Sequence, residues 1–168
     1  MNDENHVRYC SRPFPPYTYV PGSGTPHPVS DERGHMHGLA EVTPLALDSN
    51  AWFSNETYLY AIDLFNHSFF WESHEAWESL WHVAGHRGEM ADFLKGLIKL
   101  AAAGVKQYEG NTVGIERHLL RARELMASVG HNPYAGIDLQ ELIARIDKWL
   151  TEPNPQLSLD LAPVPPRP

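Results

Sequence analysis

The distribution of proline is the feature that most constrains how this chain can fold. Seven of the 14 prolines lie in residues 1–50 and six in residues 151–168, whereas residues 51–150 contain only Pro133. All five tryptophans lie in that central stretch. Proline interrupts regular structure and tryptophan requires a packed core, so the central stretch is predicted to be the folded domain. The chain is thereby divided into an N-terminal segment, a central domain and a C-terminal tail.

Apolar residues recur at helical spacing through the central domain. Five helices are expected: one carrying Tyr58, Ile62 and Phe65, one from an N-cap at Ser68 to about Ala84, one over 89–109 ending at Gly110, one over 112–129 ending at Gly130, and one from a capping residue at Asp138 to before Pro153. No strand alternation competes with this pattern, and short loops favour antiparallel neighbours. The sequence therefore predicts an all-α fold, a five-helix antiparallel bundle-like domain. Gly96 and Gly104 predict close approach of other helices to the third helix.

The two ends of the chain are expected to behave differently. The N-terminal segment, residues 1–50, is rich in proline and histidine but also contains aromatic residues such as Tyr17 and Tyr19. We expect it to lie extended against the bundle. The tail, residues 151–168, has fewer apolar anchors and is expected to be flexible.

Composition excludes several classes of function. The net charge of −8 argues against a broad nucleic-acid-binding face, which would be basic. Cys10 is the only cysteine, so an intramolecular disulfide and a thiolate-rich zinc site are excluded. No stretch approaches the roughly 20 apolar residues that cross a bilayer, and the N-terminus lacks the apolar core of a secretory signal. We expect a cytoplasmic protein that does not bind membranes.

Residues 69–82, "FFWESHEAWESLWH", combine tryptophans with acids and imidazoles. Side chains three or four positions apart share a helix face. One stripe of this helix consists of Phe70, His74, Trp77, Glu78, Trp81 and His82. His74 and Glu78 are therefore expected on the packed side, beside the indole rings, whereas Glu72 and Glu75 are expected to be more exposed.

Three interpretations of the His74–Glu78 pair remain open on residue types alone. The two side chains could satisfy each other's hydrogen bonds in the core. They could be ligands of a divalent metal ion, with His82 extending the set. They could also form an acid–base pair in a pocket. A metal site would need further ligands, and the N-terminal stretch "PHPVSDERGHMHG" offers His27 and His35.

Lysines follow one edge of the third predicted helix, at Lys95, Lys99 and Lys106. They fit a solvated flank paired with nearby acids, which stabilises a fold by about 0–1 kcal/mol per pair. They also fit an anion site at the edge of the His74–Glu78 pair.

The two central blocks, "LFNHSFFWESHEAWESLWH" and "FLKGLIKLAAAGVKQYEGN", resemble the bacterial and archaeal domain-of-unknown-function family 309 over about residues 55–125. The motif HxxxExx(W/Y) of that family is met by His74, Glu78 and Trp81. Its second block is met by Gly96, Leu97, Ile98, Ala101 and Ala102, followed by Gly110 and Asn111. Residues 12–38 look like the extension of its longer members. The resemblance implies an all-helical domain, a bacterial source and a metal role for the His and Glu, with no established reaction.

The tail contains a different pattern. Its residues Gln156, Leu157, Ser158, Leu159, Asp160 and Leu161 resemble the short peptide by which many bacterial proteins bind the DNA polymerase sliding clamp. Such a peptide would have to be exposed and mobile in the free protein. The competing interpretation is a tail that packs on the bundle.

Two functions follow as hypotheses. The first is a His/Glu pocket, bordered by Trp77, Trp81, His82, Lys95 and Lys99, that binds a divalent metal or a small anionic ligand. If the protein is an enzyme, metal-assisted hydrolysis fits this set, with His74, Glu78, His27 and His35 as ligands and Glu75 as the general base or a supporting group. The alternative is a non-enzymatic interaction protein that works through the bundle surface or the tail.

Overall fold

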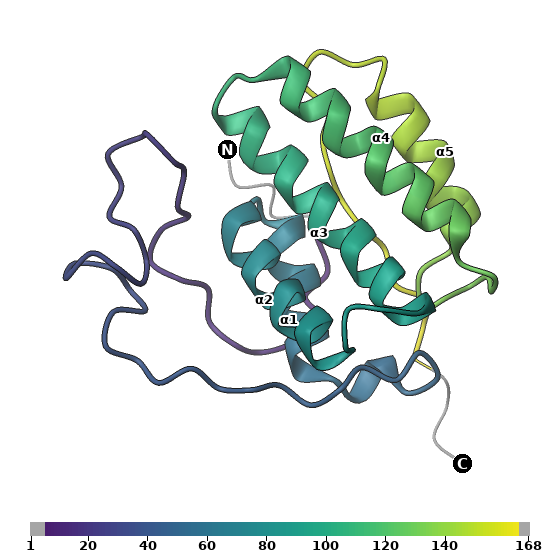
Figure 1. Cartoon of the computed structure of the whole chain (residues 1–168), viewed down its shortest axis with the longest axis horizontal. Helices are drawn as coiled ribbons and strands as arrows, with labels where there is room; N and C mark the ends of the chain where they lie inside the picture. Colours follow the sequence, from purple (N-terminus) through teal and green to yellow (C-terminus); the bar gives the residue numbers. More distant parts are fainter. Residues whose placement is uncertain (1–5, 165–168) are drawn as a thin grey trace.

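The computed structural model describes residues 6–164, and within them the chain forms five α-helices and one short 3-10 helix (Figure 1). In chain order these are η1 (Trp52–Ser54), α1 (Glu56–Asn66), α2 (Phe70–Val83), α3 (Glu89–Tyr108), α4 (Thr112–Ser128) and α5 (Leu139–Trp149). Each α-helix packs on the next one in the chain. The described part of the chain has no β-strand and no helix that is both long and apolar enough to cross a membrane. The predicted all-α, five-helix fold is confirmed.

Local signals place most of the helix ends correctly. The carboxylate of Asp138 accepts hydrogen bonds from the backbone N–H groups of Gln140 and Glu141, at 3.0 and 3.2 Å, so this residue caps α5 as predicted. Gly110 follows α3 with φ of +69°, the left-handed conformation that glycine adopts without a steric cost.

The predicted N-cap of α2 is wrong. Ser68 lies in the turn before the helix with φ of +67°, and the capping position is Phe69, which supplies no side-chain hydrogen bond. The reason is the sharp reversal between α1 and α2. Here the N–H of Phe69 donates to the carbonyl of Leu64 at 2.8 Å, and this closure forces Ser68 into the left-handed region.

The central helix of the bundle is α3, because it packs on α2 along one side and on α4 along the other. Most of its circumference is buried, and a narrow half-buried stripe remains, which contains Lys95, Lys99, Ala102 and Lys106. The glycines allow the close packing predicted from the sequence. A Cβ on Gly104 would lie 2.3 Å from the Phe70 ring of α2, and one on Gly96 would lie 2.7 Å from the Met126 methyl group of α4.

The N-terminal segment runs without helix or strand along the side of α1 and α2 (Figure 1). Two carboxylates attach it to these helices. Asp63 of α1 accepts hydrogen bonds from the Arg8 Nε at 2.9 Å, the Tyr9 N–H at 2.8 Å and the Cys10 N–H at 3.0 Å. Glu72 of α2 provides the second attachment, described with the site below.

The expectation of a free tail is wrong for its described part, residues 151–164. The tail runs back across the bundle (Figure 1), and Leu157 and Leu159 are buried while Leu161 is half-buried. Leu159 exchanges two hydrogen bonds with the Asn66 side chain, at 2.7 and 2.8 Å. These leucines fill the space beside α1 and α5, and only Gln156 and Asp160 of the proposed clamp-binding peptide remain exposed. The outer ends of the two terminal segments, residues 1–5 and 165–168, lie outside the described residues.

Candidate functional site

Three side chains with metal-ligating atoms converge on one edge of α2. The Nδ1 of His74 lies 3.4 Å from the Oε1 of Glu75 and 3.8 Å from the Oε2 of Glu78. One ligand atom from each of the three residues lies within 4.8 Å of the others, and no second such group occurs in residues 6–164. The contacts are longer than hydrogen bonds, so the three groups are close without satisfying each other.

The pair lies at the border of the core and not inside it, in contrast to the expectation. The buried stripe of α2 runs through Phe70, Ser73, Trp77 and Leu80. His74 and Glu78 each lie one position further round the helix, about 100° away from Ser73 and Trp77. Their side chains are 29% and 38% exposed, and that of Glu75 is 42% exposed. Glu75 is the most exposed of the three, as expected, and it belongs to the same cluster.

The indole rings flank this cluster on the inner side. Trp77 is completely buried, and Trp81 is half-buried at the end of the helix. The Lys95 Nζ of α3 lies 5.8 Å from the centre of the Trp81 ring, within range of a cation–π interaction. His82 is exposed and turns toward His86 in the following loop, so it does not join His74.

The lysine stripe lies on α3, the helix that packs against α2. Lys106 pairs with Glu109 at 2.7 Å, whereas Lys95 and Lys99 form no ion pair with any residue of the described chain. Within residues 6–164, Lys95 and Lys99 thus lack the direct carboxylate partners that a neutralised flank would give them.

A residue that the sequence analysis missed completes this neighbourhood. His118 of α4 is half-buried, and its pKa lies below the ordinary value of histidine. Burial is the largest cause, and the positive charges of Lys99, Lys106, Arg117 and His74 lower the pKa further. The imidazole of His118 is therefore close enough to feel both the α2 cluster and the α3 lysines. Its position next to Leu119 of the apolar stripe was the only signal in the sequence.

Removing one lysine charge should therefore be visible at His118. We expect Lys99→Gln to raise the pKa of His118 toward its ordinary value, because the substitution removes a charge that disfavours the imidazolium. Titration of the imidazole resonances by NMR measures this pKa. Lys148→Gln on the exposed side of α5 is the matched control and should leave it unchanged. An unchanged pKa of His118 in Lys99→Gln would show that the charge of Lys99 does not act on His118.

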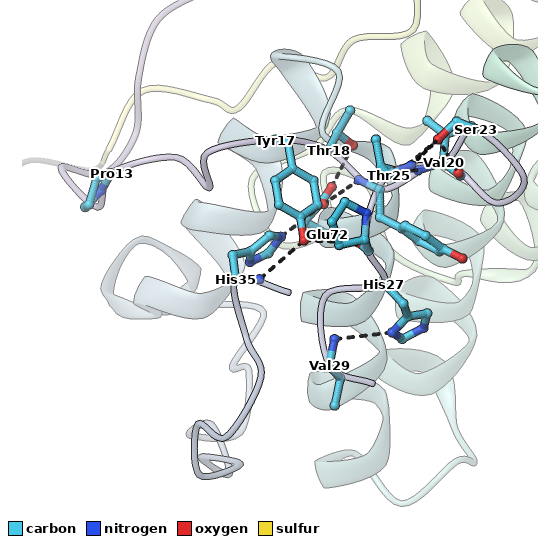
Figure 2. Close-up of polar contacts among 12 residues, drawn as sticks. Pro13, Tyr17, Thr18, Val20, Ser23, Thr25, His27, Val29, His35 and Glu72 are labelled. Carbon is cyan, nitrogen blue, oxygen red and sulfur yellow. Dashed lines mark hydrogen bonds and ion pairs between the residues drawn. The ribbon is translucent and has the colours of Figure 1, made fainter. Parts of the chain in front are cut away.

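The N-terminal histidines do not complete the cluster. The Nδ1 of His27 accepts hydrogen bonds from the N–H groups of Val29 and Ser30, both at 3.2 Å (Figure 2). The neutral ring then carries its proton on Nε2 and has no free lone pair for a metal ion. The ring of His27 packs against Trp71, with centroids 5.5 Å apart.

His35 approaches a different acid of α2. Its Nε2 lies 3.6 Å from the Oε1 of Glu72, and both side chains are at least nine-tenths buried. Glu72 also accepts hydrogen bonds from the Thr18 hydroxyl at 2.7 Å and the Tyr19 N–H at 2.8 Å (Figure 2). The expectation that Glu72 faces solvent is thus wrong, because the N-terminal segment covers it. Glu72 and His35 fix that segment on α2 and lie outside the cluster.

The cluster lies on an open surface. Two cavities in the described chain lie elsewhere. One of 310 Å³ is lined by α5 and the tail, including Arg145 and Leu161, and one of 160 Å³ lies between α4 and the end of α5. Neither of these two cavities is lined by His74, Glu78 or Trp81. The partly exposed side chains of His74, Glu75 and Glu78 form an accessible edge, which leaves room for water or a ligand at any bound ion.

The part of the chain that contains His74, Glu75 and Glu78 matches a known protein family. Residues 58–118 match the family described as domain of unknown function, DUF309, which confirms the family resemblance. The match begins in α1 and ends in α4, so it includes His74, Glu75, Glu78, Lys99 and His118. A search of curated proteins gave no match.

Proposed function

We propose that this protein binds a divalent metal ion through His74, Glu75 and Glu78, and a small anionic ligand beside it. The observation that carries the proposal is the convergence of three ligand atoms within 4.8 Å on an accessible helix edge. Two ligand atoms at about 2.0–2.2 Å from one ion lie roughly 3–4 Å apart. The measured separations of 3.4 and 3.8 Å fit that range.

The donor set and its charge indicate the kind of ion. One imidazole nitrogen and two carboxylate oxygens suit a divalent ion such as Mn²⁺ or Zn²⁺. Two carboxylates neutralise the ion, so the charges of Lys95 and Lys99 remain available to a second, anionic group. Three protein ligands on an open surface also correspond to the arrangement of catalytic sites, which keep a coordination position free.

The reaction class that fits these residues is hydrolysis of an anionic substrate such as a phosphate ester. A divalent ion at the cluster supplies Lewis acidity and lowers the pKa of bound water. On the protein side, Lys99 attracts and orients the anion. Burial and nearby positive charges lower the pKa of His118, which favours its neutral form, and the lone pair of the neutral ring can accept a proton. Glu75, expected from the sequence as a general base or a supporting group, is proposed here as a ligand.

Thermal unfolding with Mn²⁺ tests the proposal. Metal-free wild-type protein should gain about 2.7 kcal/mol of stability when the free ion is at 100 times its dissociation constant. For a chain of this size that corresponds to about 5–10 °C in Tm. Glu78→Gln should unfold near the wild-type temperature without metal, since the side chain is partly exposed, and should gain almost nothing with it.

Two control variants distinguish loss of the metal site from loss of the anion site. Glu124→Gln changes an exposed acid of α4 and should respond to Mn²⁺ like the wild type. Lys99→Gln should retain the Mn²⁺ response but lose binding of inorganic phosphate in a calorimetric titration. Equal melting shifts in wild type and Glu78→Gln would remove Glu78 from the ligands and overturn the metal site.

The second candidate function is that of an interaction protein, and one observation favours it. Leu39, Val42 and Leu45 are 69%, 81% and 83% exposed in a segment without helix or strand. Exposed apolar side chains at regular spacing are typical of peptides that dock into a partner. This segment supports such a function better than the tail, whose leucines are already packed on the bundle.

A further inference from the structure

Two histidines meet at the C-terminal end of α2, away from the proposed cluster. His82 belongs to the last turn of the helix and His86 follows in the loop that leads to α3. The Nδ1 of His82 lies 2.7 Å from the Nε2 of His86. Both side chains are exposed, so burial does not force them together, and neither forms an ion pair with a carboxylate of the described chain.

The loop holds the second imidazole in place. The His86 ring stacks on the Trp81 ring with centroids 4.1 Å apart and an interplanar angle of 31°. His86 has φ of +68°, between Gly85 at +79° and Gly88 at +94°. A left-handed conformation is uncommon for a residue other than glycine. The left-handed backbone and the contact with Trp81 together place the imidazole of His86 next to that of His82.

We propose that His82 and His86 chelate a transition-metal ion that prefers imidazole and square-planar geometry, such as Cu²⁺ or Ni²⁺. Two nitrogens at about 2.0 Å from one ion lie roughly 2.8 Å apart at a 90° angle and about 3.3 Å apart at a tetrahedral angle. The observed 2.7 Å matches the first value. Binding would replace the direct N···N contact. It requires the tautomers with protons on the Nε2 of His82 and the Nδ1 of His86, which leave the two facing nitrogens with lone pairs for the ion.

This site is separate from the one assigned to His74, Glu75 and Glu78. The midpoints of residues 74–78 and 82–86 lie eight residues apart, which is about 12 Å at 1.5 Å per residue. Two-metal catalysis requires ions about 3.5–4 Å apart. The histidine pair therefore does not supply a second ion to the proposed reaction, and its metal would tie the end of α2 to the loop before α3.

Pulsed electron paramagnetic resonance with Cu²⁺ tests the proposal on the full chain. One equivalent of Cu²⁺ at neutral pH should give modulations from the remote nitrogens of two imidazoles. His82→Gln and His86→Gln should each lose this two-imidazole signal. Their Cu²⁺ affinity should fall roughly 100-fold or more, since even the loss of a group that only orients a ligand costs about 10–100-fold.

Two further variants identify the site. His74→Gln removes the imidazole of the cluster and should keep the two-imidazole signal. His131→Gln removes an exposed histidine that pairs with Glu89 at 3.0 Å and should behave like the wild type. Protons compete with the ion for both nitrogens, so wild-type binding should weaken as the pH falls. A signal from one imidazole only, or unchanged binding in both His82→Gln and His86→Gln, would show that the pair is a hydrogen bond and nothing more.

Discussion

Replacing Asp63 with alanine should lower the free energy of unfolding by about 2–4 kcal/mol, because three donors lose a completely buried acceptor and only the Arg8 side chain, 34% exposed, can turn to water instead. The Asp63 side chain is completely buried in α1 and accepts three hydrogen bonds from consecutive residues of the N-terminal segment. Without the carboxylate, the guanidinium of Arg8 and two backbone N–H groups lose their partner at once. Urea unfolding followed by tryptophan fluorescence measures the loss.

The same substitution should also loosen the N-terminal segment. Amide hydrogen exchange at Tyr9 and Cys10 should become faster, because their N–H groups donate to Asp63 in the wild type. Asp147→Ala is the matched control. It removes an exposed carboxylate paired with Arg123, and it should change stability little. A loss in Asp63→Ala no larger than in this control would show that the segment is held by other contacts.

The helices could be predicted from the sequence because their signals are local. A capping residue acts within one helical turn, as Asp138 shows. The helical spacing of the apolar residues in α1 can be recognised without knowing which elements pack against them. Ser68 was misassigned because a serine before a helix resembles an N-cap in sequence, whereas the turn between α1 and α2 imposes a left-handed backbone there. The capping preference of serine depends on the residue type alone, whereas the backbone conformation of this turn depends on how α1 and α2 pack against each other.

The burial of Glu72 could not be predicted from α2 alone. The groups that cover it, Thr18 and Tyr19, lie 54 and 53 residues earlier in the chain. The packing of the tail could not be predicted for the same reason, because Leu159 forms a hydrogen bond with Asn66, which lies 93 residues earlier in the chain. Helical periodicity reports which face a helix buries against other helices. Helical periodicity does not show which other face of the helix is covered by an extended segment from elsewhere in the chain.

The candidate site was predicted in part. The spacing of His74 and Glu78 placed both on one side of α2. Glu75, predicted as a base or a supporting group, lies close enough to offer a third ligand atom, because an adjacent position can turn its side chain to the same edge. The partial exposure of His74 and Glu78 follows from their offset of one residue from the buried Ser73 and Trp77, respectively. The position of His118 in this neighbourhood could not be predicted from the sequence, because only the packing of α4 on α3 brings it near Lys99.

The second large effect is expected at the contact between α2 and α3. Gly104→Ala should lower the free energy of unfolding by about 2–3 kcal/mol, within the range for overpacking a closed core. The added Cβ would lie 2.3 Å from the Cγ of Phe70, whereas carbon atoms in contact are about 3.5–4.0 Å apart. The Phe70 ring cannot step aside freely, because the rings of Phe65 and Tyr108 flank it with centroids 5.3 and 5.6 Å away.

Gly96→Ala provides a control on the same helix that separates packing from helix propensity. Both substitutions gain up to about 1 kcal/mol from the better helix propensity of alanine. At position 96 the nearest atom is the terminal methyl of Met126, at 2.7 Å, and methionine has rotatable bonds that let it move. Gly96→Ala should therefore stay within about 1 kcal/mol of the wild type, and Tm should fall by about 4–12 °C only in Gly104→Ala. Equal stability of the two variants in a calorimetric scan would mean that α2 and α3 can separate without cost and that Gly104 does not set their distance.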